Sequence, residues 1–100
     1  MFVFVCSPYG GKRENFKRAQ EYCAMEMALG NTPFAPHVHY HGILSEDVDR
    51  ETGIQHGLEV LSRVDELHRW TKEITAGMRR EIEYAESAGI PVRVMVDEVY

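Results

Sequence analysis

Short apolar runs alternate with longer segments of mixed polarity along the chain. Residues 2–6 are all apolar and rich in β-formers, as in a strand that is buried on both faces. In residues 13–29 the apolar positions recur at a spacing near 3.6, which is typical of an amphipathic helix. The same criteria predict strands at 2–6, 32–36, 64–70 and 90–96, and helices at 13–29, about 46–63 and 76–88.

Individual residues add detail to these elements. The predicted apolar face of the first helix consists of Phe16, Ala19, Tyr22, Cys23 and Met27. Ser45 is the expected N-cap of the second helix, whose apolar positions are Val48, Ile54, Leu58 and Leu61. Residues 32–36 are expected to form a short extended segment, because both of its prolines exclude a helix interior. Residues 37–42 are expected to form a loop. The third strand is unusually polar for a central one, with Glu66, His68 and Arg69.

Strands that alternate with helices indicate an α/β fold with a parallel sheet covered on both faces. We expect a three-layer, flavodoxin-like (Rossmann-like) sandwich whose four parallel strands lie in the order 2-1-3-4, with right-handed crossovers. Such sheets bind ligands beyond the carboxyl ends of their strands, at the switch point between the first and third strands. The loops expected there are residues 7–12 and 71–77.

Length and composition limit the possible classes. One hundred residues predict a single domain over 1–100, and 44% apolar with 27% charged residues is typical of a globular chain. The net charge of −5 argues against binding to nucleic acid polymers, which requires a basic face. No run approaches the roughly 20 apolar residues of a membrane span, and the start has no basic segment of a signal peptide. We therefore expect a cytoplasmic protein with no membrane partner, in which Cys6 and Cys23 are reduced core residues.

The loop after the first strand, residues 7–12, contains Gly10 and Gly11 next to each other. Two glycines let backbone N–H groups approach a phosphate, and the following helix start favours anions. The loop matches neither a Walker A nor a GxGxxG motif. It is either a phosphate-binding loop or a turn that needs a flexible backbone.

Glu81 lies four residues after Gly77 and four before Ala85, so two small side chains flank it on one helix face. Such neighbours leave room for a ligand beside the carboxylate. The helix macrodipole is expected to favour its ionised form. An ionised carboxylate in an apolar pocket can attack an anomeric carbon and form a covalent glycosyl intermediate. The alternative is a surface glutamate that is solvated or paired with Arg80.

Aromatic and imidazole side chains also stand near the predicted ligand edge. The alternating His37, His39 and His41 would bind a metal, line a pocket, or lie on a surface loop. Tyr9 and Trp70 would stack on a base, although core packing is the commoner fate of a lone tryptophan. We expect no metal and no cofactor.

Two segments together resemble the nucleoside 2-deoxyribosyltransferase-like superfamily, which includes the 2′-deoxynucleoside 5′-phosphate N-hydrolases. They are the strand and Ser-X-X-Gly-Gly loop at 2–11, and the run from Asp65 through the third strand to Thr75-Ala76-Gly77-X3-Glu81-X3-Ala85. The chain is most similar to short bacterial and phage members with SPYGG, FAPH and GMRREIEYA-like segments. The resemblance implies a flavodoxin-like fold, homo-oligomers with sites near subunit interfaces, and cleavage of the bond between base and deoxyribose.

The resemblance also implies roles for individual positions. Glu81 matches the nucleophile, and Ser7 with the backbone of Gly10 and Gly11 matches the 5′-phosphate site. Thr75 matches a serine that contacts phosphate, and Asp65 matches a structural acid. Tyr9, Gly77 and His37 complete the expected substrate site.

Other positions depart from the superfamily pattern. Its aspartate, which assists at the base, is Gly57 here, its nucleophile-orienting tyrosine is Val3, and the arginine of the hydrolases' phosphate loop is Tyr9. His37, His39 or Asp47 would have to replace the missing proton donor.

Three hypotheses follow. The chain is an N-glycosidic bond hydrolase or deoxyribosyltransferase, a non-catalytic protein that sequesters a nucleotide or nucleotide-derived signal, or an oligomeric scaffold. In the first, residues 97–100 would complete the pocket of a neighbouring subunit.

Overall fold

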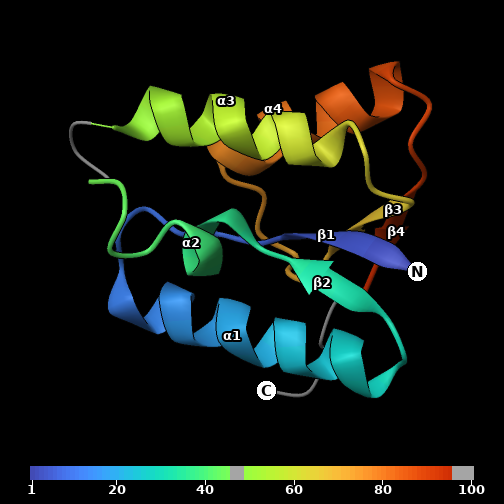
Figure 1. Cartoon of the computed structure of the whole chain (residues 1–100), viewed down its shortest axis with the longest axis horizontal. Helices are drawn as coiled ribbons and strands as arrows, with labels where there is room; N and C mark the ends of the chain where they lie inside the picture. The colour runs from blue at the N-terminus through green and yellow to red at the C-terminus, as the bar shows by residue number, and fades with distance from the viewer. Residues whose placement is uncertain (46–48, 96–100) are drawn as a thin grey trace.

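The computed structural model describes residues 1–45 and 49–95 and has a four-stranded parallel sheet at its centre (Figure 1). The strand order is β2-β1-β3-β4, and every neighbouring pair is parallel. The predicted order 2-1-3-4 is therefore confirmed. The strands are β1 (Phe2–Cys6), β2 (Thr32–Phe34), β3 (Glu66–Arg69) and β4 (Val92–Val94).

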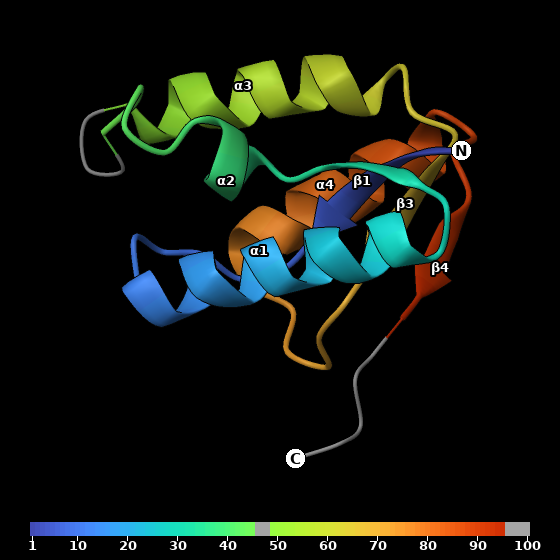
Figure 2. The ribbon, with the colours of Figure 1, turned by 60° about the horizontal axis from the view of Figure 1, so that its bottom comes forward.

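Helices cover both faces of the sheet and give the predicted three-layer α/β fold. The helices are α1 (Arg13–Ala28), α2 (Pro36–His39), α3 (Arg50–Leu61) and α4 (Ala76–Ser87). Figure 1 shows α1 on one side of the sheet and α3 with α4 on the other, and in Figure 2 α1 lies in front of β1 with α4 behind. Among the helices described, none is long and apolar enough to cross a bilayer.

The side chains of β1 alternate between two cores. Phe4 and Cys6 pack with residues of α3 and α4, whereas Val5 packs with Tyr22 of α1 and with Trp70, the residue after β3. Because side chains of a strand alternate with period two, Val3 shares the α1 face with Val5. All four side chains are fully buried, as predicted for a strand covered on both sides.

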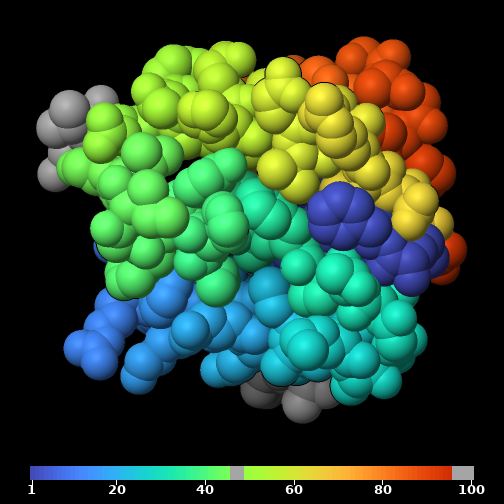
Figure 3. Space-filling view, in the orientation of Figure 1, coloured from blue at the N-terminus to red at the C-terminus, as the bar shows by residue number. Residues whose placement is uncertain are grey.

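The segment 37–42 differs from the predicted loop. Pro36 begins a short helix, α2, and is placed at its N-terminal position, where a proline without an N–H group fits well. Pro36 thus marks where this helix starts. Figure 3 shows α2 and the turn after it filling the space between α3 and α1.

Two helix predictions also need correction. On α1, Met27 is 66% exposed while Glu26 is fully buried. The second predicted helix begins at Arg50, with Asp49 and not Ser45 as its N-cap. Residues 46–48, which include the predicted apolar position Val48, lie outside the described residues.

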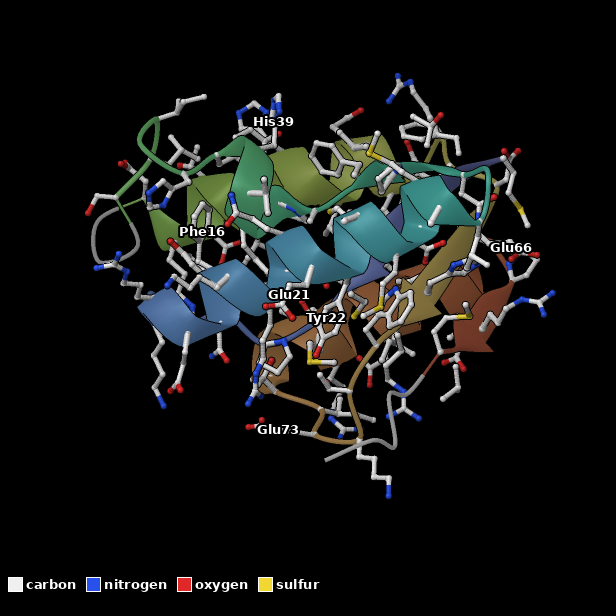
Figure 4. The ribbon with its side chains drawn as sticks, turned by 90° about the horizontal axis from the view of Figure 1, so that it is seen from below. Phe16, Glu21, Tyr22, His39, Glu66 and Glu73 are labelled. Carbon is white, nitrogen blue, oxygen red and sulfur yellow. The ribbon has the colours of Figure 1, made fainter. Side chains whose placement is uncertain are left out.

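Glu26 is buried because β3 supplies its hydrogen-bond partners. Its Oε2 lies 2.6 Å from Nδ1 of His68 and accepts a 2.9 Å bond from Nε1 of Trp70, while its Oε1 accepts from Asn31. The other ring nitrogen of His68 lies 2.8 Å from Oε1 of Glu66. These polar side chains of the central strand therefore form one network on the α1 face. Figure 4 views the structure from this side, with Glu66 beyond the C-terminal end of α1.

Candidate functional site

A cavity of about 110 Å³ opens at the carboxyl ends of β1 and β3, at the predicted switch point. Its walls come from the loop after β1, from α2, from the start of α3 and from the start of α4. Seven of the predicted site residues line it: Ser7, Tyr9, Gly10, His37, Thr75, Gly77 and Glu81. Gly11 does not line it and is exposed.

The loop after β1 contains Gly10 and Gly11 because its backbone conformation requires glycine at both positions. Gly10 and Gly11 have φ values of 59° and 74°, in the left-handed region that favours glycine. The N–H of Lys12 closes this turn on the carbonyl of Tyr9 at 3.1 Å. The turn therefore needs both glycines, and only Gly10 faces the cavity.

Ser7 has a hydroxyl group without a protein partner. The residue is 2% exposed, lines the cavity, and its Oγ makes no hydrogen bond within the described part of the chain. An unpaired buried hydroxyl costs stability, on the order of 1–3 kcal/mol. A polar ligand atom in the cavity would satisfy it.

His37 connects α2 to the loop after β1. Its Nε2 lies 2.6 Å from the backbone carbonyl of Ser7, so this nitrogen is the donor, and its ring stacks on Tyr9 with 4.9 Å between centroids. Burial lowers the pKa of His37, and the bond to Ser7 opposes this shift. His37 is therefore a neutral part of the cavity wall and a poor replacement for the missing proton donor.

The other two histidines of the alternating set lie in different surroundings. His41 lines the cavity and stacks on Phe16 at 4.1 Å, whereas His39 is exposed and contacts Phe34 and Tyr40. Within residues 1–45 and 49–95 no group of three His, Cys, Asp or Glu side chains has the arrangement of a metal site.

Glu81 lies on α4 in the cavity wall. Thr75 caps this helix through its Oγ1, which accepts a 3.3 Å bond from the N–H of Met78. The side chain of Glu81 is half-buried, and burial raises its pKa to about 8, while a hydrogen bond from the Cys6 thiol lowers it. The prediction that the helix macrodipole favours the ionised form of Glu81 is thus wrong. Glu81 is in the second turn of α4, beyond the first turn in which the macrodipole acts.

The alternative prediction, a surface Glu81 paired with Arg80, does not match the contacts of Arg80. Arg80 forms two hydrogen bonds of 3.1 Å with the carboxylate of Glu51 on α3. Its guanidinium is therefore engaged by another helix, and the Glu81 carboxylate reaches solvent through the cavity.

Of the positions that depart from the superfamily, Tyr9 lines the cavity together with Glu81, whereas Gly57 and Val3 do not line it. Gly57 is buried on α3, where an added Cβ would lie 3.4 Å from Cγ of Pro36. Val3 faces the α1 layer. Asp47 and residues 97–100 lie outside the described residues.

Sequence reasoning missed two charged residues of the cavity wall, Asp49 and Arg50. The Oδ2 of Asp49 accepts a 2.9 Å bond from the N–H of Ser45. Both residues lie where α3 begins. The predicted helix started near residue 46, so these residues were expected inside the helix and not at its N-terminus.

Trp70 and Asp65, which the sequence analysis singled out, form contacts within the fold and do not line the cavity. The indole of Trp70 is buried, stacks on Tyr22 at 5.1 Å and donates to Glu26, so core packing is correct and base stacking is wrong. The Oδ2 of Asp65 accepts a 2.7 Å bond from the N–H of Phe2, which links the starts of β1 and β3. Cys6 and Cys23 are free thiols.

Comparison with known proteins places the chain in a family. The family model described as "Domain of unknown function (DUF7768)" matches residues 1–95. No curated protein matches the chain. Among eight matching chains of solved structures is a 2-deoxyribosyltransferase from the psychrotolerant bacterium Bacillus psychrosaccharolyticus, with 18% identity and a TM-score of 0.73 over 100% of this chain and 77% of that chain. The chain thus has the fold of a 2-deoxyribosyltransferase and belongs to the DUF7768 family.

Proposed function

We propose that the cavity binds a nucleoside or nucleotide and that Glu81 attacks its anomeric carbon to break the N-glycosidic bond. The observation that carries this proposal is the presence of Glu81 and the unpaired Ser7 hydroxyl in one cavity at the ligand edge of the sheet. The likeness in fold to a deoxyribosyltransferase supports the same class of ligand.

The proposed reaction has two steps. A carboxylate oxygen of Glu81 bonds to C1′ while the bond from C1′ to the base breaks, and the base leaves with the electron pair and takes up a proton. Water then attacks C1′, its bond to Glu81 breaks, and the free sugar is released as the water loses a proton. In a transfer reaction a second base attacks C1′ instead, and a new nucleoside is released. Ser7, Thr75 and the backbone of Gly10 would hold the phosphate of a nucleotide, with Arg50 as the nearby cation.

The direct test is base release from a panel of deoxynucleosides, ribonucleosides and their monophosphates. We expect Glu81→Ala to lower the rate roughly a thousandfold or more, because it removes the attacking group. The matched control is Glu83→Ala, an exposed glutamate on the same helix, which should retain the rate. Equal rates for Glu81→Ala and the unmodified protein would exclude this role.

The rate of base release should rise with pH and level off above about pH 8. Only the ionised carboxylate attacks, and with a pKa of about 8 roughly a tenth of Glu81 is ionised at pH 7. Single-turnover rates between pH 6 and 9.5 measure this profile. A rate that falls across the same range would contradict Glu81 as the nucleophile.

A second candidate function is ligand sequestration without turnover. It is favoured by the protonated state of Glu81 near neutral pH and by the packing of Gly57 against Pro36 at the position of the superfamily's assisting acid. Protonated Glu81 would donate a hydrogen bond to the ligand, so affinity would fall above pH 8. Ligand retained in native mass spectrometry without base release would identify this binder.

The third hypothesis, an oligomeric scaffold, would be favoured if Ser7 and Glu81 substitutions changed neither binding nor folding. Homo-oligomerisation remains part of the proposal, and sedimentation analysis would test it.

A further inference from the structure

The two sides of the cavity differ in their side chains. The loop after β1 and the start of α4 contribute mostly small and polar residues, including Ser7, Gly10, Thr75 and Gly77. The other side consists of α2, the turn after it and the start of α3, and it contributes most of the apolar side chains, which are Pro36, Leu44 and Ile54. A nucleobase has apolar faces and a polar edge, so it suits this α2–α3 side.

Asp49 places a carboxylate on the α2–α3 side. The residue is half-buried and is the N-cap of α3, yet its side chain makes no capping bond to that helix. Instead its Oδ2 accepts a 2.9 Å bond from the N–H of Ser45, and its own N–H donates to the carbonyl of Ser45 at 2.7 Å. A carboxylate has about four acceptor positions, so the bond to Ser45 leaves it able to accept another from a ligand.

Contacts between α3 and α4 bring this carboxylate into the cavity of Glu81. Arg80, the residue before Glu81, donates two 3.1 Å bonds to Glu51, which is two residues after Asp49. The first turn of α3 is therefore joined to α4 beside the candidate nucleophile. Among the described residues, Asp49 and Glu81 are the two acids that line the cavity. The base of a nucleoside is bonded directly to C1′, so a ligand with C1′ at Glu81 has its base in the space that Asp49 also borders.

We propose that Asp49 selects nucleobases that carry an exocyclic amino group, which are adenine, cytosine and guanine. An amino group donates to the carboxylate, whereas the carbonyl oxygen of an oxo base brings a second acceptor against it. This inference rests on the proposed function, because it requires a nucleoside in the cavity.

The neighbouring Arg50 predicts the opposite preference. Its guanidinium also lines the cavity and can only donate, so it would favour a base with a carbonyl oxygen. Asp49 is half-buried while Arg50 is exposed. A hydrogen bond is stronger where water is excluded, so the carboxylate should dominate the choice of base.

Matched pairs of nucleosides test this selection. Deoxyadenosine and deoxyinosine differ in an amino group against a carbonyl, and so do deoxycytidine and deoxyuridine. Calorimetry gives their dissociation constants, with and without a 5′-phosphate, in Glu81→Gln, which lacks the attacking carboxylate. The amino member of each pair should bind about tenfold more tightly or better. Adding Asp49→Asn should abolish or reverse this preference, because the amide oxygen can still accept from Ser45 while its NH2 group turns an acceptor into a donor.

The matched control is Glu59→Gln in the same background. Glu59 is an exposed residue of α3 that bonds to Arg63 and does not line the cavity, so this variant should keep the amino preference. If Asp49→Asn does not fold, Asp49→Ser should weaken the preference in its place, because a hydroxyl both donates and accepts. Equal binding of amino and oxo nucleosides would overturn the proposal, and tighter binding of the oxo nucleosides would overturn it in favour of Arg50.

The outcomes separate this inference from the proposed function. A purely structural Asp49 would shift the melting temperature in Asp49→Asn and leave the amino preference intact. That result, with base release by the unmodified protein, would reject the selection and retain the proposed function. A preference that Asp49→Asn abolishes, in a protein that releases no base, would support the selection and reject the attack by Glu81. Binding of none of these nucleosides or monophosphates would reject both.

Discussion

Glu81→Gln is expected to raise the free energy of unfolding at pH 9 by several kcal/mol while it abolishes base release. The pKa of Glu81 is about 8 in the fold, against the usual 4.5 of an unfolded chain. Below pH 4.5 both states are protonated. Between pH 4.5 and 8 only the folded state keeps the proton, so stability falls as pH rises, by on the order of 4 kcal/mol in total. The glutamine side chain of the variant stays neutral at every pH and avoids this loss.

Urea unfolding at pH 4 and pH 9 measures the effect. The difference between Glu81→Gln and the unmodified protein should be small at pH 4 and large at pH 9. The matched control, Glu83→Gln, alters an exposed glutamate of the same helix and should show little change at either pH. A difference that is the same at both pH values would mean that the Glu81 carboxyl titrates normally.

Glu26→Ala is expected to destabilise the fold by about 3–5 kcal/mol, because it removes one member of a buried hydrogen-bonded network and leaves the other members without their partner. The carboxylate is fully buried and accepts bonds from His68, Trp70 and Asn31. Both ring nitrogens of His68 face carboxylate oxygens, Nδ1 at 2.6 Å from Glu26 and Nε2 at 2.8 Å from Glu66. Without Glu26 the imidazole of His68 and the indole N–H of Trp70 lose their buried hydrogen-bond partner.

Chemical denaturation measures the free energy of unfolding of Glu26→Ala and of the control variant Glu21→Ala. Glu21 is an exposed residue of the same helix, and its substitution should change stability by at most about 0.5 kcal/mol. Each single substitution by leucine leaves the other residue of the pair, Glu26 or His68, buried without its partner. The double substitution removes both residues, so it should cost less than the sum of the two single substitutions. Strict additivity, or a small effect of Glu26→Ala, would show that the network contributes little.

The sheet order was predictable because it depends on local patterns. The apolar run of β1, the polar loop after it and the alternation of strands with helices all point to one architecture. The network on the α1 face was not predictable. Glu26 and His68 are 42 residues apart, so the pattern on α1 favoured Met27 as the buried position, and the polarity of β3 had no visible partner.

The candidate site was predictable as a set of positions but not as an electrostatic environment. The 77–81–85 spacing correctly placed Glu81 beside a cavity, because helix periodicity alone fixes that face. Its pKa is raised by burial, which depends on how segments distant in the sequence pack around it and which helix periodicity does not reveal. Asp49 and Arg50 were missed because helix boundaries are the least certain part of a sequence-based prediction.

The sheet separates two groups of ionisable side chains. The Glu26–His68–Glu66 network lies on the α1 face, whereas Glu81 and Cys6 lie on the α4 face. Substitutions in the cavity therefore leave the polar interior of the opposite layer untouched. A domain built this way can acquire a new ligand preference through changes on one face, while the other face continues to hold the fold together.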